Sequence, residues 1–174
     1  KGAKDILIHE KYTDFAEKLI AETDLIFCLD FNVLSRIKNL GPAVASSSAK
    51  KVLIDHHPYP DDICDIIISH PEISSTSELI FRLICRMGDF ELMNKFSAEA
   101  IYMGMMTDTG AFTYNSNDPQ IYYIIAQLLS KGIDKDQIYS NVYHNYSADR
   151  YRMMGYMISE KMKIFDDYGV AMMW

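Results

Sequence analysis

The chain has 174 residues, of which 49% are hydrophobic and 24% charged, a composition that excludes intrinsic disorder and collagen-like structure. Its apolar runs are far shorter than the roughly 20 residues that a membrane-spanning helix needs, so we expect no membrane span. Seventeen basic against 24 acidic residues give a formal net charge of -7, which argues against a protein that coats long nucleic acids.

The first half of the chain alternates helical and strand patterns. Apolar side chains at helical spacing predict a helix over 14–22, and continuous apolar runs predict strands over 25–29, 51–54 and 64–68. Gly41-Pro42 interrupts the segment between the first two strands. Continuous hydrophobicity is typical of a parallel sheet covered on both faces, with helices in the crossovers. The predicted fold class is α/β, with a doubly wound, mainly parallel sheet followed by a helical linker.

The second half is mostly helical until its end. The hydroxyl-rich stretch 74–78 predicts the N-terminus of a helix that runs to 87, and two more amphipathic helices are predicted over 97–106 and 119–129. Helical patterns over 134–143 and 148–160 then lead to a predicted hairpin of 162–165 and 170–174.

These patterns divide the chain into three predicted parts. They are an α/β domain over 1–132, a helical linker over 133–161 and the start of a second domain over 162–174. The chain begins without Met and stops inside a predicted strand. We therefore expect it to be a piece of a longer protein, cut at both ends.

Cysteine usage bears on the compartment. Cys28, Cys64 and Cys85 lie in apolar stretches, are odd in number and form no C-x-x-C pair. This argues against a disulfide framework or a zinc knuckle. We therefore expect reduced, buried cysteines and a cytoplasmic protein.

Polar side chains follow two of the predicted strands. Asp30 comes directly after the first, and Asp55-His56-His57 follow the second. Ligands of parallel α/β sheets bind beyond the carboxyl ends of the strands, which makes these residues candidates for a site. Asp30 as a helix N-cap, and the two histidines as a polar loop or a buried imidazole bonded to backbone, are the structural alternatives.

A third polar point lies at the end of an apolar helix, in the sequence Thr-Asp-Thr-Gly-Ala-Phe of residues 107–112. Gly110 as a helix C-cap and Asp108 as a turn residue are the alternatives here. Asp30, His56 and Asp108 together would make an oxygen-rich, nitrogen-poor set of donors. Such a set suits Mn²⁺ or Mg²⁺ better than zinc.

Asp30, Asp55-His56-His57 and residues 107–112, in this order and spacing, resemble three motifs of the DHH phosphoesterase superfamily. Residues 71–79 and 146–156 are similar to its branch of short-oligoribonucleases (nanoRNases) and phosphoadenosine-phosphate phosphatases, often labelled exopolyphosphatase-related. The resemblance covers nearly the whole chain. It implies a DHH catalytic domain over 1–132 and a DHHA1-like domain that begins near 162.

The resemblance implies a two-metal phosphoesterase that uses Mn²⁺, with Mg²⁺ as the alternative. Asp30 would bridge both ions, and His56 and Asp108 would ligate the second. His57 and Asp55 are the implied catalytic residues: His57 beside the scissile phosphate, and Asp55 orienting an imidazole.

The remaining implied roles concern the substrate and the missing motif. Ser75, Thr76 and Thr109 are the expected substrate-binding residues, with plain helix capping as the alternative for the serine-rich segment. The family's first motif, His-x-x-x-Asp-x-Asp, does not occur in this chain. We therefore expect the chain alone to be inactive.

The expected reaction is hydrolysis of short oligoribonucleotides or 3′-phosphorylated adenosine nucleotides to mononucleotides by a water that two metals activate. The expected partners are accordingly short RNA or small nucleotides and no membrane, and a homodimer is left open. Cyclic-dinucleotide, polyphosphate or pyrophosphate hydrolysis, and a non-catalytic nucleotide-binding role, are the alternatives.

Overall fold

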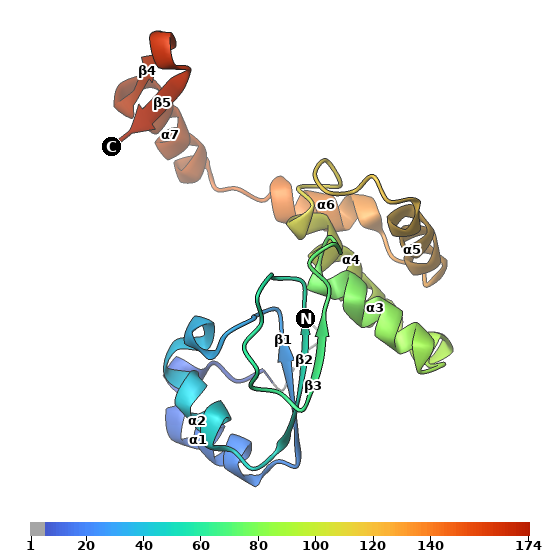
Figure 1. Cartoon of the computed structure of the whole chain (residues 1–174). Helices are drawn as coiled ribbons and strands as arrows, with labels where there is room; N and C mark the ends of the chain where they lie inside the picture. The colour runs from blue at the N-terminus through green and yellow to red at the C-terminus, as the bar shows by residue number, and fades with distance from the viewer. Residues whose placement is uncertain (1–5) are drawn as a thin grey trace. The chain divides into compact units, whose positions relative to one another are not determined.

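The computed structural model describes residues 6–174, which fall into two compact units, the first ending at Lys135 and the second spanning Asp136–Trp174. The candidate site lies in the first unit. Its helices and strands are α1 (Thr13–Glu22), β1 (Leu25–Leu29), α2 (Gly41–Ser46), β2 (Lys50–Asp55), β3 (Ile66–Ser69), α3 (Thr76–Arg86), α4 (Lys95–Asp108) and α5 (Pro119–Ser130), with 3-10 helices at His9–Lys11, Leu34–Leu40 and Phe90–Leu92 (Figure 1).

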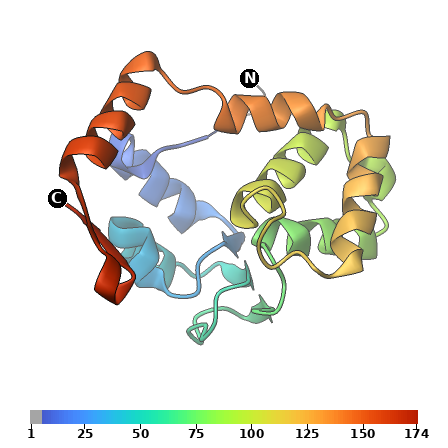
Figure 2. The same cartoon turned by 90° about the horizontal axis from the view of Figure 1, so that it is seen from above.

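The three strands form one parallel sheet in the order β1-β2-β3. Leu29 of β1 lies beside Ile54 of β2, and Asp55 lies beside Ser69 of β3. Helices α1 and α2 lie on one side of the sheet and α3 and α4 on the other (Figure 2). The predicted α/β class is therefore confirmed, and the carboxyl ends of the strands meet at one edge.

Buried apolar side chains of this unit lie on the sheet and α2 and also on α3, α4 and α5. On the face of the sheet that α2 covers, Cys28, Val44 and Leu53 form a buried cluster, with side chains of the 3-10 helix over Leu34–Leu40 packed around it. The opposite face is less well covered at β1, where Phe27 is 53% exposed. In the described residues the expected cover on both faces is thus incomplete at β1, which is one of the two edge strands of the sheet.

Two local differences from the expected elements have clear causes. Strand β3 begins at Ile66 rather than at 64, because the Asp65 carboxylate accepts hydrogen bonds from the Lys51 backbone N–H and the Lys50 ammonium, both 2.8 Å long. Helix α2 occupies a segment for which the sequence predicted only a break. Pro42 lies in its first turn, where a proline costs no helical hydrogen bond.

The cysteines are all free, but only Cys28 is buried. Cys64 is half-buried, and its burial together with the neighbouring Cys28 raises the pKa of the Cys64 thiol to about 12. Cys85 is exposed on α3, so the expectation of three buried cysteines is wrong for this residue.

The second unit contains α6 (Lys135–Tyr143) from its second residue onward, α7 (Ala148–Tyr156) and an antiparallel hairpin of β4 (Met162–Phe165) and β5 (Val170–Met173). The hairpin is as predicted. The predicted helix over 148–160 ends as an α-helix at Tyr156 and continues as a π-helical turn over Met157–Lys161. Here the Ser159 hydroxyl donates to the Gly155 carbonyl at 2.9 Å, a local bond that competes with regular helical pairing.

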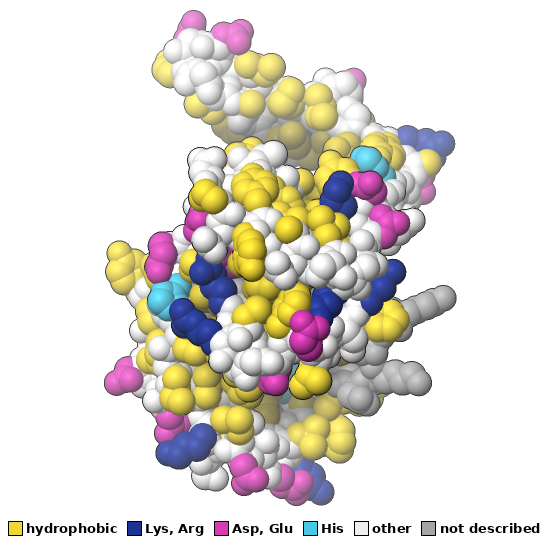
Figure 3. Space-filling model, turned by 90° about the vertical axis from the view of Figure 1, so that its right-hand side faces the viewer, with side chains coloured by type: hydrophobic (Ala, Val, Ile, Leu, Met, Phe, Trp, Pro, Cys, Tyr) yellow, Lys and Arg dark blue, Asp and Glu magenta, His cyan; other side chains and the backbone are white. Residues whose placement is uncertain are grey.

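Two surface features complete the description. Within residues 6–174, no helix combines the length and the apolar character that crossing a membrane would require. On the face drawn in Figure 3, basic, acidic and hydrophobic side chains are interspersed.

Candidate metal centre

Asp30 reaches the carboxyl edge of the sheet because it directly follows β1. Its backbone N–H donates to the Ile54 carbonyl at 3.2 Å, which continues the strand pairing by one residue. Its φ of 64° then turns the chain sharply, in a left-handed conformation that aspartate tolerates better than most residues. The N-cap alternative does not hold, because the next helical segment begins only at Leu34. The carboxylate is therefore free to face the site.

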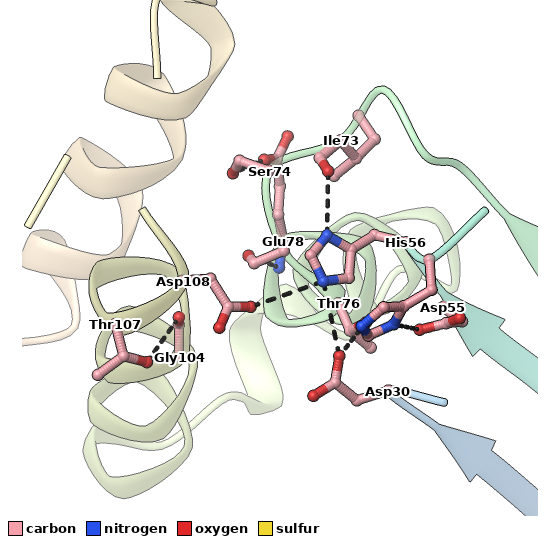
Figure 4. Close-up of polar contacts among 12 residues, drawn as sticks. Asp30, Asp55, His56, Ile73, Ser74, Thr76, Glu78, Gly104, Thr107 and Asp108 are labelled. Atoms are coloured by element: carbon pink, nitrogen blue, oxygen red, sulfur yellow. Dashed lines mark hydrogen bonds and ion pairs between the residues drawn. The ribbon is translucent and has the colours of Figure 1, made fainter. Parts of the chain in front are cut away.

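Asp55, His56 and His57 occupy the adjacent strand end. The Asp55 side chain is completely buried, and its Oδ1 accepts the Nδ1 proton of His57 at 2.8 Å. Nδ1 of His56 donates to the Ile73 carbonyl at 3.3 Å. Since both Nδ1 atoms are occupied in this way, Nε2 is the nitrogen that each imidazole leaves for a ligand. Nε2 of His56 faces the carboxylates of Asp30 and Asp108 (Figure 4).

Asp108 is the last residue of α4 and comes from the other side of the sheet. The approach of α4 to α3 is close: a Cβ on Gly104 would lie 2.8 Å from the Cβ of Ser77, a distance that real side chains do not reach. A glycine at this position thus lets the two helices come near each other. One turn later, Asp108 faces the imidazole of His56.

The carboxylates and imidazoles face one another across a gap. Nε2 of His56 lies 3.7 Å from Oδ1 of Asp30 and 4.0 Å from Oδ2 of Asp108, longer than a direct hydrogen bond. Ligand atoms of Asp30, His56 and His57 all lie within 4.8 Å of one another. Such a group could hold a metal ion.

The electrostatics of the site favour a bound cation. Partial burial and the negative charge of Asp30 raise the pKa of the Asp108 carboxyl above its ordinary value, and His56 and His57 offset this only in part. Among the described residues, neither aspartate has an ion pair with a lysine or arginine. The donors are carboxylate oxygens and imidazole nitrogens, which fit a divalent ion such as Mn²⁺ or Mg²⁺.

The hydroxyls of the three predicted substrate-binding residues form hydrogen bonds within the protein. Ser75 is fully buried and caps α3, because its hydroxyl accepts the Glu78 backbone N–H at 3.1 Å. Thr109 is also fully buried, and its hydroxyl donates to the Met105 carbonyl at 2.7 Å. The Thr76 hydroxyl donates to Oδ1 of Asp30 at 2.9 Å. A substrate role for these three residues stays a prediction. For Ser75 the structure shows the alternative, which is helix capping.

Sequence reasoning missed an ion pair between the buried Glu78 and the half-buried Arg82, close in the chain to the loop that holds His56. Glu78 is 1% exposed and accepts two hydrogen bonds from Arg82, at 2.6 and 2.9 Å, and one from the Ser74 hydroxyl at 2.9 Å. Ser74 directly follows Ile73, whose carbonyl holds His56. The spacing of Glu78 and Arg82, four residues apart on one helix, is a sequence signal that could have revealed the pair.

Fold and site together define an α/β domain that gathers acidic and imidazole ligands at the carboxyl edge of a parallel sheet. Residues 2–105 match the family described as "DHH family, N-terminal domain", which is more than half of the chain. The chain therefore belongs to the DHH family. The match includes Asp30 and Asp55-His56-His57 and ends three residues before Asp108.

The chain is also similar to individual proteins. It is similar to a crystal structure of an exopolyphosphatase-related protein from Bacteroides fragilis, with 60% identity and a TM-score of 0.96 over 99% of this chain and 50% of that one. It is 36% identical over 92 residues to the uncharacterized protein MG371 homolog of Mycoplasma pneumoniae, covering 53% of this chain and 28% of that protein.

The name of a third relative states its activities. The bifunctional oligoribonuclease and PAP phosphatase NrnA of Bacillus subtilis is 29% identical over 98 residues, which cover 56% of this chain and 31% of that protein. The chain thus spans about half the length of the similar structure and less than a third of these two curated relatives.

Proposed function

We propose that the protein to which this chain belongs is a metal-dependent phosphoesterase that hydrolyses short oligoribonucleotides or 3′-phosphorylated adenosine nucleotides. The observation that carries the proposal is the convergence of Asp30, His56, His57 and Asp108 from three separate segments on one edge of the sheet. The proposed substrates are those of the Bacillus subtilis relative, which is named an oligoribonuclease and PAP phosphatase.

In this proposal Asp30, His56 and Asp108 would hold the metal, which we take to be Mn²⁺, and Asp30 would serve both ions of a two-metal site. Bound divalent ions in such sites supply an activated water and neutralise charge on the phosphate. The Ile73 carbonyl keeps the proton of His56 on Nδ1, so that Nε2 keeps a lone pair for the metal.

His57 has a different proposed task. With its Nδ1 proton held by the buried carboxylate of Asp55, the ring is fixed in orientation and presents Nε2 to the substrate. In its protonated form, Nε2–H donates to a non-bridging phosphate oxygen, where negative charge increases in the transition state. Asp55 is thus a positioning residue for His57, and it also stabilises the charged ring.

The test is an assay of the full-length protein with RNA of two to five nucleotides and with adenosine 3′,5′-bisphosphate, each with Mn²⁺. Pyrophosphate and a cyclic dinucleotide serve as competing substrates. We expect mononucleotide products, loss of activity with EDTA, recovery with added Mn²⁺ and no activity in the Asp30→Asn variant. Activity that persists in EDTA would contradict metal dependence, and a clear preference for pyrophosphate or the cyclic dinucleotide would contradict the proposed substrates.

A further inference from the structure

Thr76 makes a contact that joins two distant parts of the first unit. Its hydroxyl donates to Oδ1 of Asp30 at 2.9 Å, across 46 positions of sequence (Figure 4). The donor is firmly placed, because Thr76 is only 5% exposed and is the first residue of α3, directly after the Ser75 cap. The acceptor is much less enclosed: the Asp30 side chain is 58% exposed.

An exposed carboxylate at a turn ordinarily rotates among several side-chain conformations, and holding it in one conformation costs entropy. For Asp30, the hydrogen bond from Thr76 selects the conformation in which Oδ1 also lies 3.7 Å from Nε2 of His56. Among the described residues, the other polar groups near this carboxylate are His56, at a distance too long for a hydrogen bond, His57, whose ligand atom lies within 4.8 Å, and Asp108, whose negative charge repels it. The hydroxyl of Thr76 is therefore the group that orients Asp30 before any ligand binds.

We propose that Thr76 is a positioning residue for the metal ligand Asp30 and is not a direct ligand of the substrate. The inference rests on the proposed function, since it takes Asp30 as a metal ligand. A phosphate oxygen would have to displace the Asp30 carboxylate as the acceptor of this hydrogen bond, and it would have to reach a residue that is only 5% exposed. Donation to Oδ1 leaves the other lone pairs of the carboxylate for metal ions.

The test compares Thr76→Val with Thr76→Ser in the full-length protein. Valine keeps the β-branched shape and removes the hydroxyl, whereas serine keeps the hydroxyl. Mn²⁺ affinity is measured by calorimetry without substrate, and thermal unfolding in EDTA shows whether each variant is folded. Removing a group that orients a ligand usually weakens metal binding roughly 10–100-fold. We expect a loss of this size for Thr76→Val and a much smaller loss for Thr76→Ser.

Steady-state kinetics separate this role from substrate binding. If Thr76 acts through Asp30, a sufficiently high Mn²⁺ concentration restores the turnover of Thr76→Val, and KM at saturating metal stays near the wild-type value. Wild-type Mn²⁺ affinity in folded Thr76→Val overturns the inference and leaves the proposed function intact. A raised KM that persists at saturating Mn²⁺ shows instead that Thr76 contacts substrate. A wild-type protein that binds no divalent ion overturns the proposed function itself, and with it the role of Thr76.

Discussion

Replacing His57 by alanine in the full-length protein should leave Mn²⁺ affinity close to the wild-type value while it reduces turnover sharply. The two adjacent histidines differ in their surroundings. His56 has carboxylates of Asp30 and Asp108 at 3.7 and 4.0 Å from its Nε2, whereas the polar contact of the His57 ring is with the buried Asp55. The two rings meet edge to face, with their centroids 4.8 Å apart and their planes inclined by 64°.

The expected magnitude follows from the single N–H that His57 offers to the phosphate. Loss of one fixed donor to a developing negative charge typically lowers kcat by about 10²–10³, or about 2.7–4 kcal/mol of transition-state stabilisation. His56→Ala should instead lose both Mn²⁺ binding and activity, because it removes a ligand. Asp55→Asn keeps the His57 side chain but removes the charge that orients it. We therefore expect a loss of about 10–100-fold in activity, between the wild type and His57→Ala.

Calorimetric titration with Mn²⁺, beside steady-state hydrolysis of a dinucleotide at saturating metal, distinguishes these cases. The ligand atom of His57 lies within 4.8 Å of those of Asp30 and His56, so a direct role in holding the ion is the competing interpretation. If His57→Ala and His56→Ala lose Mn²⁺ affinity equally, both imidazoles are ligands. The proposed division between a metal ligand and a phosphate donor would then be wrong.

Two further predictions concern the framework behind the site. Gly104→Ala should destabilise the first unit by about 1–3 kcal/mol in urea unfolding and weaken Mn²⁺ binding, because the new methyl group would push α4 away from Ser77 of α3. The matched control is Gly155→Ala on α7, where a Cβ meets nothing within 4 Å, and where alanine should be neutral or slightly stabilising; equal effects of the two would refute the packing argument. Glu78→Gln should cost about 1.5–3 kcal/mol, since it weakens charge-assisted hydrogen bonds to a carboxylate that is 1% exposed. Glu99→Gln, which removes the charge from a more exposed helical ion pair, should cost less than 1 kcal/mol by the same urea measurement, and an equal cost would refute the role of burial.

Much of the fold could be predicted from local patterns. The strand Leu25–Leu29 has the expected bounds, because a run of large apolar residues between polar ones leaves little choice of conformation or of ends. The cap of α3 was likewise visible in its hydroxyl-rich start, and Ser75 makes it. The extent of β3 was less predictable, since the Asp65 carboxylate replaces a backbone partner at its start.

The sequence by itself determined that Asp30 and Asp55-His56-His57 lie at the ends of apolar strands, and parallel strands place such residues at a common edge. Only the tertiary structure decided what surrounds them. Whether Thr76 faces a substrate or Asp30 depends on where the start of α3 lies relative to the end of β1, and the position of Asp108 depends on the close contact at Gly104. The physical reason is that strand and cap signals come from neighbouring residues, whereas ligand geometry depends on packing between segments far apart in the chain.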